Sequence, residues 1–121
     1  MAMTTMHALM QALAGQPEPD RPADIRVVRG REVHCAIRPA AVAALARLLR
    51  MGFGAELLFM AAADRRPDGA AFEVHYLFGP GREDWFLHAS AAVPADDPAL
   101  TSLATFHYPA SRFEREIYDL F

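Results

Sequence analysis

The first hydrophobic pattern along the chain is helical. Thr4 or Thr5 can cap the helix, and Gly15 follows it as a stop signal. The apolar positions, which recur at helical spacing, are Met6, Leu9, Met10 and Leu13. The next nine residues, "QPEPDRPAD", contain three prolines and predict a loop or tether. We therefore predict an N-terminal helix and proline-rich tether over residues 1–23, followed by one domain over residues 24–121.

A second helix, the clearest in the sequence, is predicted at "RPAAVAALARLLRMG", residues 38–52. Pro39 stands in its first turn, where the missing N–H costs no hydrogen bond, and Gly52 follows as the stop. The apolar stripe of this helix consists of Val42, Leu45, Leu48 and Leu49.

Elsewhere the pattern changes to the alternation that is typical of strands. Residues 25–37 predict two short strands that turn at Gly30. Residues 55–63, "AELLFMAAA", are apolar on both faces, which predicts a central strand or one covered on both sides. Residues 70–78 and 84–93 alternate well and predict a hairpin.

The alternation in the hairpin predicts which side chains face the core. These are Phe72, Val74, Tyr76 and Phe78 on the first strand, and Trp85, Leu87, Ala89 and Ala91 on the second. If both sets face the core, the register can place Tyr76 opposite Leu87 and His75 opposite His88. The order of elements predicts an α+β fold, in which a single domain has a mostly antiparallel sheet with helices packed mainly on one face.

Composition agrees with one globular domain. A chain of 121 residues has room for one core, and 53% hydrophobic with 22% charged residues excludes a disordered chain. The net charge of −3 gives no basic field, so we expect no nucleic-acid binding. The sequence contains no run of about 18 apolar residues, so we predict no membrane span. The single Cys35 and the absence of a signal-peptide pattern at the start predict a cytoplasmic protein.

Candidate metal ligands are few. His75 and His88 can form a pair in the hairpin, with Asp64 or Glu73 as a further ligand. Catalytic zinc needs at least three protein ligands, so structural or surface histidines are the favoured interpretation. A free-standing enzyme or metal-binding domain that uses this pair is the alternative.

Nucleophilic chemistry has little support in the sequence. His34 and Cys35 are neighbours on a strand and point to opposite faces. Cys35 alternates with Val33 and Ile37, which favours a small buried core residue over a reactive thiol. No G-x-S-x-G elbow and no phosphate-binding glycine loop occurs. We therefore expect no active site and no cofactor.

The face of the hairpin opposite the core is unusually apolar. Leu77 and Phe86 lie there beside the two histidines, and the neighbouring strand offers Leu58 and Met60. Such a patch favours contact with a partner or with a helix of the same chain. A homo-oligomeric binding module that uses the Leu77/Phe86 face is therefore a further alternative.

The end of the chain, "SRFEREIYDLF", predicts a helix that starts with the capping box of Ser111 and Glu114. Glu114 and Glu116 lie about 200° apart around a helix, so they cannot act as a general acid and base on one face. The plain interpretation of these charges is a solvated helix face.

The segment "LTSLATFHYPASRFEREIYDLF" resembles the signature of the 30 kDa subunit of respiratory NADH:quinone oxidoreductase. The looser upstream pattern of helix and strands is also similar, so the resemblance covers about residues 25–121. The matching residues are Ser102, Leu103, Pro109, Ala110, Glu114, Arg115, Glu116, Tyr118, Asp119, Leu120 and Phe121.

The resemblance implies a non-catalytic accessory subunit without a cofactor. It implies docking onto the large catalytic-type subunit of the peripheral arm, with the membrane reached only through the complex. The residues that it assigns to partner binding are Glu114, Arg115, Glu116, Tyr118, Asp119 and Phe121. Similar domains in membrane-bound nickel–iron hydrogenases and formate hydrogenlyases leave the type of complex open.

Overall fold

The computed structural model describes residues 2–64, 71–80 and 83–94. Along the chain these residues form α1 (Ala2–Ala14), β1 (Ala23–Val28), β2 (Glu32–Ala36), the short 3₁₀ helix η1 (Pro39–Ala41), α2 (Val42–Phe53), β3 (Ala55–Asp64), β4 (Ala71–Pro80) and β5 (Phe86–Pro94). This is the predicted order of helix, two strands, helix and three strands. The helix predicted at "SRFEREIYDLF" lies outside the described residues.

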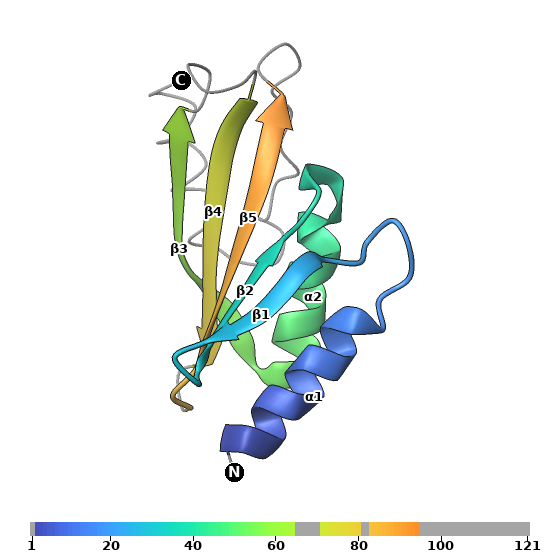
Figure 1. Cartoon of the computed structure of the whole chain (residues 1–121), viewed down its shortest axis with the longest axis vertical. Coiled ribbons are helices and arrows are strands. Elements are labelled where there is room, and N and C mark those ends of the chain that lie inside the picture. Colours follow the sequence, from blue (N-terminus) through green and yellow to red (C-terminus); the bar gives the residue numbers. More distant parts are fainter. Residues whose placement is uncertain (1, 65–70, 81–82, 95–121) are drawn as a thin grey trace.

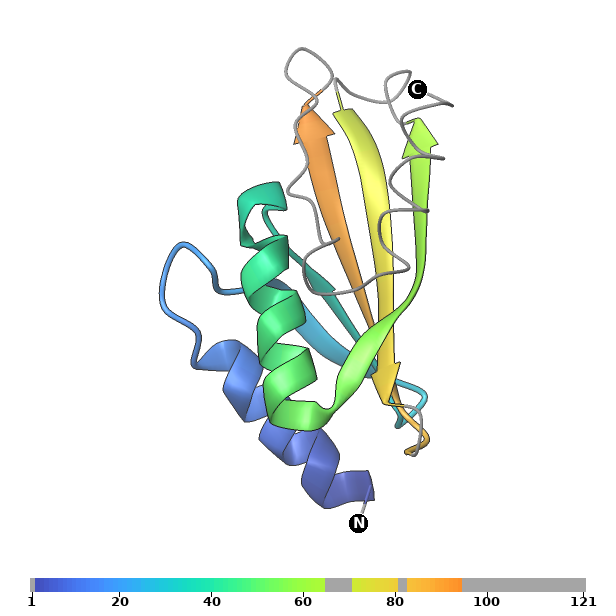
Figure 2. The ribbon, with the colours of Figure 1, turned by 180° about the vertical axis from the view of Figure 1, so that it is seen from behind.

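The strands form one five-stranded sheet in the order β1-β2-β5-β4-β3 (Figure 1). Neighbouring strands are antiparallel except β2 and β5, which run parallel. Both α1 and α2 lie on the same side of the sheet (Figure 2). The predicted α+β class is therefore confirmed. We call the sheet face toward the helices the inner face and the opposite one the outer face.

α1 packs into the core through the predicted stripe. Met6, Leu9 and Leu13 are buried, and Met10 packs against them. After the last turn the N–H of Gly15 donates to the carbonyl oxygen of Gln11 over 2.9 Å. These side chains join the same buried cluster as those of α2 and the sheet. The domain boundary at residue 23 stays a prediction, and the helix before it shares the core of the domain after it.

α2 is preceded directly by the 3₁₀ helix η1 and is capped at its end by Gly54. Pro39 opens η1, where its missing N–H is not needed. The predicted stop at Gly52 is wrong, because α2 continues through Gly52 to Phe53 and its cap residue is Gly54. Gly54 has a φ of +64°, a left-handed conformation that favours a residue without Cβ, and its N–H donates to Leu49. The face toward the sheet buries Val42, Leu45, Ala46 and Leu49.

β3 differs from the prediction of a central or doubly covered strand. In the described part of the sheet it stands at one end and pairs with β4 alone. Its register with β4 shifts between Leu57 and Phe59, so Leu58 is the extra residue of a bulge. Leu58 and Phe59 are 46% and 53% exposed. Apolar residues therefore occupy both faces of β3, and those on the outer face, Leu58 and Phe59, form part of an exposed apolar patch.

The β4–β5 hairpin has the predicted faces in a different register. Tyr76 pairs with Ala89, and Leu77 pairs with His88. The predicted pairs Tyr76–Leu87 and His75–His88 are thus wrong by two residues. The reason is that β4 continues through Gly79 to Pro80, which moves the turn toward β5. A shift of two residues keeps each side chain on its face, so Val74, Tyr76, Phe78, Trp85, Leu87, Ala89 and Ala91 are buried as predicted.

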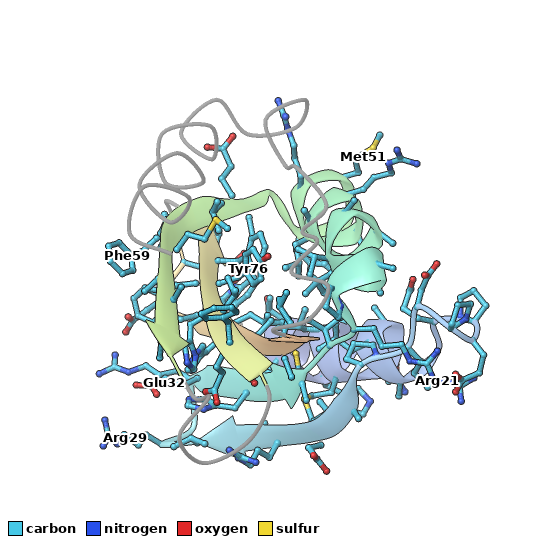
Figure 3. All side chains as sticks on the ribbon, turned by 90° about the horizontal axis from the view of Figure 1, so that it is seen from above. Arg21, Arg29, Glu32, Met51, Phe59 and Tyr76 are labelled. Carbon is cyan, nitrogen blue, oxygen red and sulfur yellow. The ribbon has the colours of Figure 1, made fainter. Side chains whose placement is uncertain are left out.

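The inner face is closed by large aromatic side chains. Trp85 is 1% exposed, and its ring meets that of Phe53 almost perpendicularly, with the centroids 6.4 Å apart. Tyr76 points inward to the helices, whereas Phe59 points away on the outer side (Figure 3). This ring contact links the end of α2 to the residue before β5, and among the described residues the exposed apolar side chains of β3 and β5 lie on the outer face.

Candidate functional site

The residues predicted to bind a partner lie outside the part of the chain that the structure describes. They are Glu114, Arg115, Glu116, Tyr118, Asp119 and Phe121. Their role stays a prediction. Within the described residues, polar side chains from several strands gather on the outer face of the sheet.

Three strands contribute to a line of polar side chains that we call the histidine row. It consists of Glu73 and His75 on β4, His88 on β5, and His34 and Glu32 on β2. The intervening residues of each strand face the core, so the alternation of a strand turns these five side chains outward. In the parallel β2–β5 pair, His34 stands directly beside His88. His75 pairs with Ser90, so it meets His88 diagonally.

The five side chains contact one another from β4 to β2. Nε2 of His75 lies 2.7 Å from Oε1 of Glu73, and Nδ1 of His75 lies 2.8 Å from Nε2 of His88. The ring of His88 meets that of His34 edge to face, with the centroids 4.9 Å apart. Nε2 of His34 is 3.3 Å from Oε2 of Glu32. The row is therefore a chain of contacts across both sides of β5.

The hydrogen bonds assign a tautomer to two of the rings. An ionised carboxylate only accepts, so Nε2 of His75 carries the hydrogen that is donated to Glu73. In the neutral ring Nδ1 of His75 is then an acceptor. Nε2 of His88 must donate to it, which leaves Nδ1 of His88 without a hydrogen. When both rings are neutral, both are thus Nε2–H tautomers.

The surroundings of His88 favour its neutral form. Burial lowers the pKa of His88 below its ordinary value of 6.5, and the nearby His75 and His34 lower it further. Glu73 and Glu32 act in the opposite direction and do not reverse the effect. A neutral His88 at pH 7 agrees with the donor and acceptor roles in the row.

Two hollows flank the row and share His34 and His88 in their walls. One, of about 220 Å³, extends toward β1 and is also lined by Asp24, Arg26 and Ser90. The other, of about 240 Å³, extends toward the apolar side chains of Leu77 and Phe86. The row therefore separates a polar hollow from a mainly apolar one.

Beyond the second hollow the outer face is apolar. Leu58 and Phe86 close over Gly79, and Phe59 pairs with Leu77 on the same face. Leu58, Leu77 and Phe86 thus lie on the predicted face. The prediction for Met60 is wrong, because the bulge in β3 reverses the alternation and Met60 is buried in the core.

A metal centre finds no support in the described residues. Among them, no group of three or more His, Cys, Asp or Glu side chains is placed to hold an ion. Both ring nitrogens of His75 are already occupied by Glu73 and His88. The contact between His75 and His88 that the sequence suggested is present, and it is a hydrogen bond.

Cys35 lies on the inner face of the same strand as His34. It is 5% exposed, and burial raises its pKa to about 12. The thiolate form that reacts with electrophiles is therefore scarce at neutral pH. The predicted assignment as a core residue agrees with this environment.

His34 and Glu32 were not assigned to the site from the sequence. The alternation of β2 places both on the face opposite Val33 and Cys35. The sequence did not show which strand would pair with β2. The parallel pairing of β2 with β5 brings His34 to His88, and a parallel partner distant in the sequence leaves no turn signal between the two strands.

Comparison with known proteins gives the family of the chain. Residues 35–121 match the family described as respiratory-chain NADH dehydrogenase, 30 Kd subunit. No curated protein sequence matches the chain significantly. In the described part of the chain, no helix has the length and apolar character required to span a membrane.

Two solved structures share the fold. One belongs to the membrane-bound sulfane sulfur reductase, an archaeal respiratory membrane complex, with a TM-score of 0.78 and 16% identity over 96% of this chain and 67% of that one. The other is a trypsin-resistant fragment of Nqo5, with a TM-score of 0.69 and 22% identity over 97% of this chain and 92% of that one. The family match spans most of the chain, including the C-terminal signature, and the chain therefore belongs to the 30 kDa subunit family of respiratory-chain NADH dehydrogenase.

Proposed function

We propose that this protein is a non-catalytic accessory subunit of a respiratory oxidoreductase of the NADH:quinone oxidoreductase type. It docks onto the large catalytic-type subunit of the peripheral arm, on the cytoplasmic side, and reaches the membrane only through the complex. The observation that carries this proposal is the family match over residues 35–121, which includes the signature "EREIYDLF".

The proposed mechanism is positional. Glu114, Arg115, Glu116 and Asp119 supply charge for contacts with the large subunit, while Tyr118 and Phe121 supply apolar area. Interfaces concentrate their binding free energy in a few aromatic and arginine residues, so Tyr118 and Arg115 are the expected anchors. By holding the large subunit in place, the protein keeps the redox centres of neighbouring subunits in register without carrying electrons itself.

The described site supports a role of this kind. Its polar groups hydrogen-bond to one another in the histidine row, and beside them lies an apolar patch of partly exposed side chains. Apolar patches of this sort are common where a protein meets a partner.

The test is purification of the tagged full-length gene product from its own cells in mild detergent, with partners identified by mass spectrometry. We expect a large subunit related to those of respiratory oxidoreductases to be recovered in stoichiometric amount. The double variant Tyr118→Ala/Arg115→Ala should lose this partner. Met51→Ala, which changes an apolar side chain that is 81% exposed on α2, should retain it. Recovery of the wild-type protein alone would refute the proposal.

The same experiment distinguishes the related complexes. A large subunit of the nickel–iron hydrogenase or formate hydrogenlyase type would assign the protein to that group instead. A wild-type protein that is recovered without partners, and that forms a dimer with rising concentration in ultracentrifugation, would favour the homo-oligomeric module.

A further inference from the structure

The histidine row joins three strands through imidazole side chains that contact one another. His75 on β4 bonds to His88 on β5, and His88 contacts His34 on β2. The side chains of His34 and His75 are 26% and 29% exposed. Solvent protons therefore reach the row, although its members are partly shielded from water.

The row can accept one proton readily and a second only with difficulty. At 2.8 Å, the two facing nitrogens of His75 and His88 have room for one hydrogen between them. A first added proton can bind to Nδ1 of His88, which carries no hydrogen, and the bond from Nε2 of His88 to Nδ1 of His75 is preserved. When both rings are fully protonated, two N–H groups and two positive charges face each other. The bond must then break and the rings must separate.

The charges around His88 are nearly balanced while the imidazoles are neutral. In the described residues the charged groups that face the row come from β4, β2, β1 and the turn between β1 and β2. They are the carboxylates of Asp24, Glu32 and Glu73 and the guanidinium groups of Arg26 and Arg29. The carboxylates outnumber the arginines by one, so protonation of the three imidazoles changes the sign of the local charge.

We propose that the histidine row is a pH-sensitive switch on the outer face of the sheet. While the imidazoles are neutral, His75 and His88 share one hydrogen, the row ties β4 to β5 and the local charge is negative. When both rings are protonated the tie is broken, the charged rings of His75 and His88 repel each other, and the local charge becomes positive. The switch responds to the proton itself and does not depend on the proposed docking function.

The test is long-range ¹H–¹⁵N NMR of the imidazoles in the labelled full-length chain, titrated from pH 8 to pH 5. At pH 8 we expect Nε2–H tautomers for His75 and His88. On acidification we expect coupled titration of the two rings, and the backbone amides of β4 and β5 next to the row should shift with the same midpoints. The tautomers are read from the wild-type protein, so this part of the test needs no substitution.

Two variants test the coupling. His75→Gln removes one of the groups that disfavour a charged His88, so the midpoint of His88 should move to higher pH. His7→Gln changes an exposed histidine of α1 that is not part of the row, and the midpoint of His88 should stay the same. The proposal is overturned if His88 is an Nδ1–H tautomer at pH 8. It is also overturned if His88 titrates at the same midpoint in the wild type and in His75→Gln.

Discussion

Gly79 shows how closely the outer face is packed around one backbone position. A Cβ placed there would lie 2.9 Å from Cδ1 of Leu58 and 3.3 Å from Cδ1 of Phe86. The carbonyl oxygen of Trp85 would lie 3.4 Å away. Real Cβ atoms essentially never approach another atom as closely as 2.9 Å, so any side chain at this position must displace Leu58. The apolar patch on the outer face therefore depends on a residue without a side chain.

Gly79→Ala is expected to lower the free energy of unfolding by no more than about 1 kcal/mol. The new methyl group crowds the patch, but the nearest atom, Cδ1 of Leu58, is the end of a flexible and half-exposed side chain that can move aside. Urea denaturation measures this change. The second substitution Leu58→Ala should restore part of the loss by making room for the methyl group. Gly52→Ala is the matched control, since its Cβ would have only Leu48 Cδ1 at 3.9 Å, and it should stabilise the helix by roughly 0.5–1 kcal/mol. Equal effects at the two glycines would contradict the close packing at Gly79.

The thiol of Cys35 is expected to be nearly inert in the folded protein. With a pKa of about 12, only about one thiol in ten thousand is ionised at pH 8. Reaction with a disulfide reagent at this pH should therefore be slow in buffer and fast in denaturing urea. A rate in buffer that matches the rate in urea would show that Cys35 is not in the core.

At the scale of the element, α2 and β3 are separated by a single residue. α2 ends at Phe53 and is capped by Gly54, and β3 begins at the next residue, Ala55, which is fully buried. The left-handed conformation of Gly54 lets the chain turn within one residue and directs Ala55 into the core. Gly54 thus sets where β3 starts and how it is aligned with β4.

Gly54→Ala is expected to cost about 1–2 kcal/mol, since a Cβ is unfavourable at positive φ even though no atom lies within 4 Å of the position. Gly54→Asn should cost less, because asparagine tolerates this conformation better than alanine. Thermal unfolding of the two variants measures the difference. If asparagine is no better than alanine, backbone conformation is not the cause.

The elements were more predictable from the sequence than their neighbours in the sheet. Periodicity predicted the buried face of α2 and of the hairpin, because burial follows directly from the 3.6 and 2.0 residue repeats. It failed at Met60, where a bulge changed the phase, and at Gly52, where a glycine fits within the helix. Register depends on where a turn is placed, so a strand that continued through Gly79 shifted the hairpin by two residues. His75 and His88 were found as a pair, but His34 was not, because its pairing joins strands distant in the sequence.

At the scale of the whole molecule, the described residues give the sheet a buried inner face and a more exposed outer face. The inner face buries the aromatic core under α1 and α2, while the histidine row and the apolar patch share the outer face. The strands that carry the histidine row on the outer face also carry core residues on the inner face. Protonation of a side chain in the row is therefore expected to change the free energy of unfolding of the whole domain.

Acidification is expected to reduce the stability of the domain through His88. Its pKa is lowered in the folded state, so between that pKa and the ordinary value of 6.5 the unfolded chain binds more protons than the folded one. The contribution of His88 is fully present above pH 6.5 and is lost as the pH falls toward the folded pKa. Urea midpoints measured between pH 8 and pH 5 should fall less steeply in His88→Gln than in the wild type. The control His7→Gln should keep the wild-type slope, and a wild-type slope in His88→Gln would contradict the assignment.

The parallel pairing of β2 with β5 also has a consequence for the order of folding. Glu32 pairs with Phe86, far along the chain, whereas β1–β2 and β3–β4–β5 are each joined by local connections. Closing the long loop between β2 and β5 costs chain entropy before any contact is gained, so the pairing of these two strands should limit the folding rate. Val33 pairs with Leu87 between these two strands, so Val33→Ala should slow refolding in stopped-flow experiments. Leu9→Ala in α1 should mainly speed unfolding. The strand pair that completes the histidine row is also the one that joins the two-stranded unit β1–β2 and the three-stranded unit β3–β4–β5 into a single sheet.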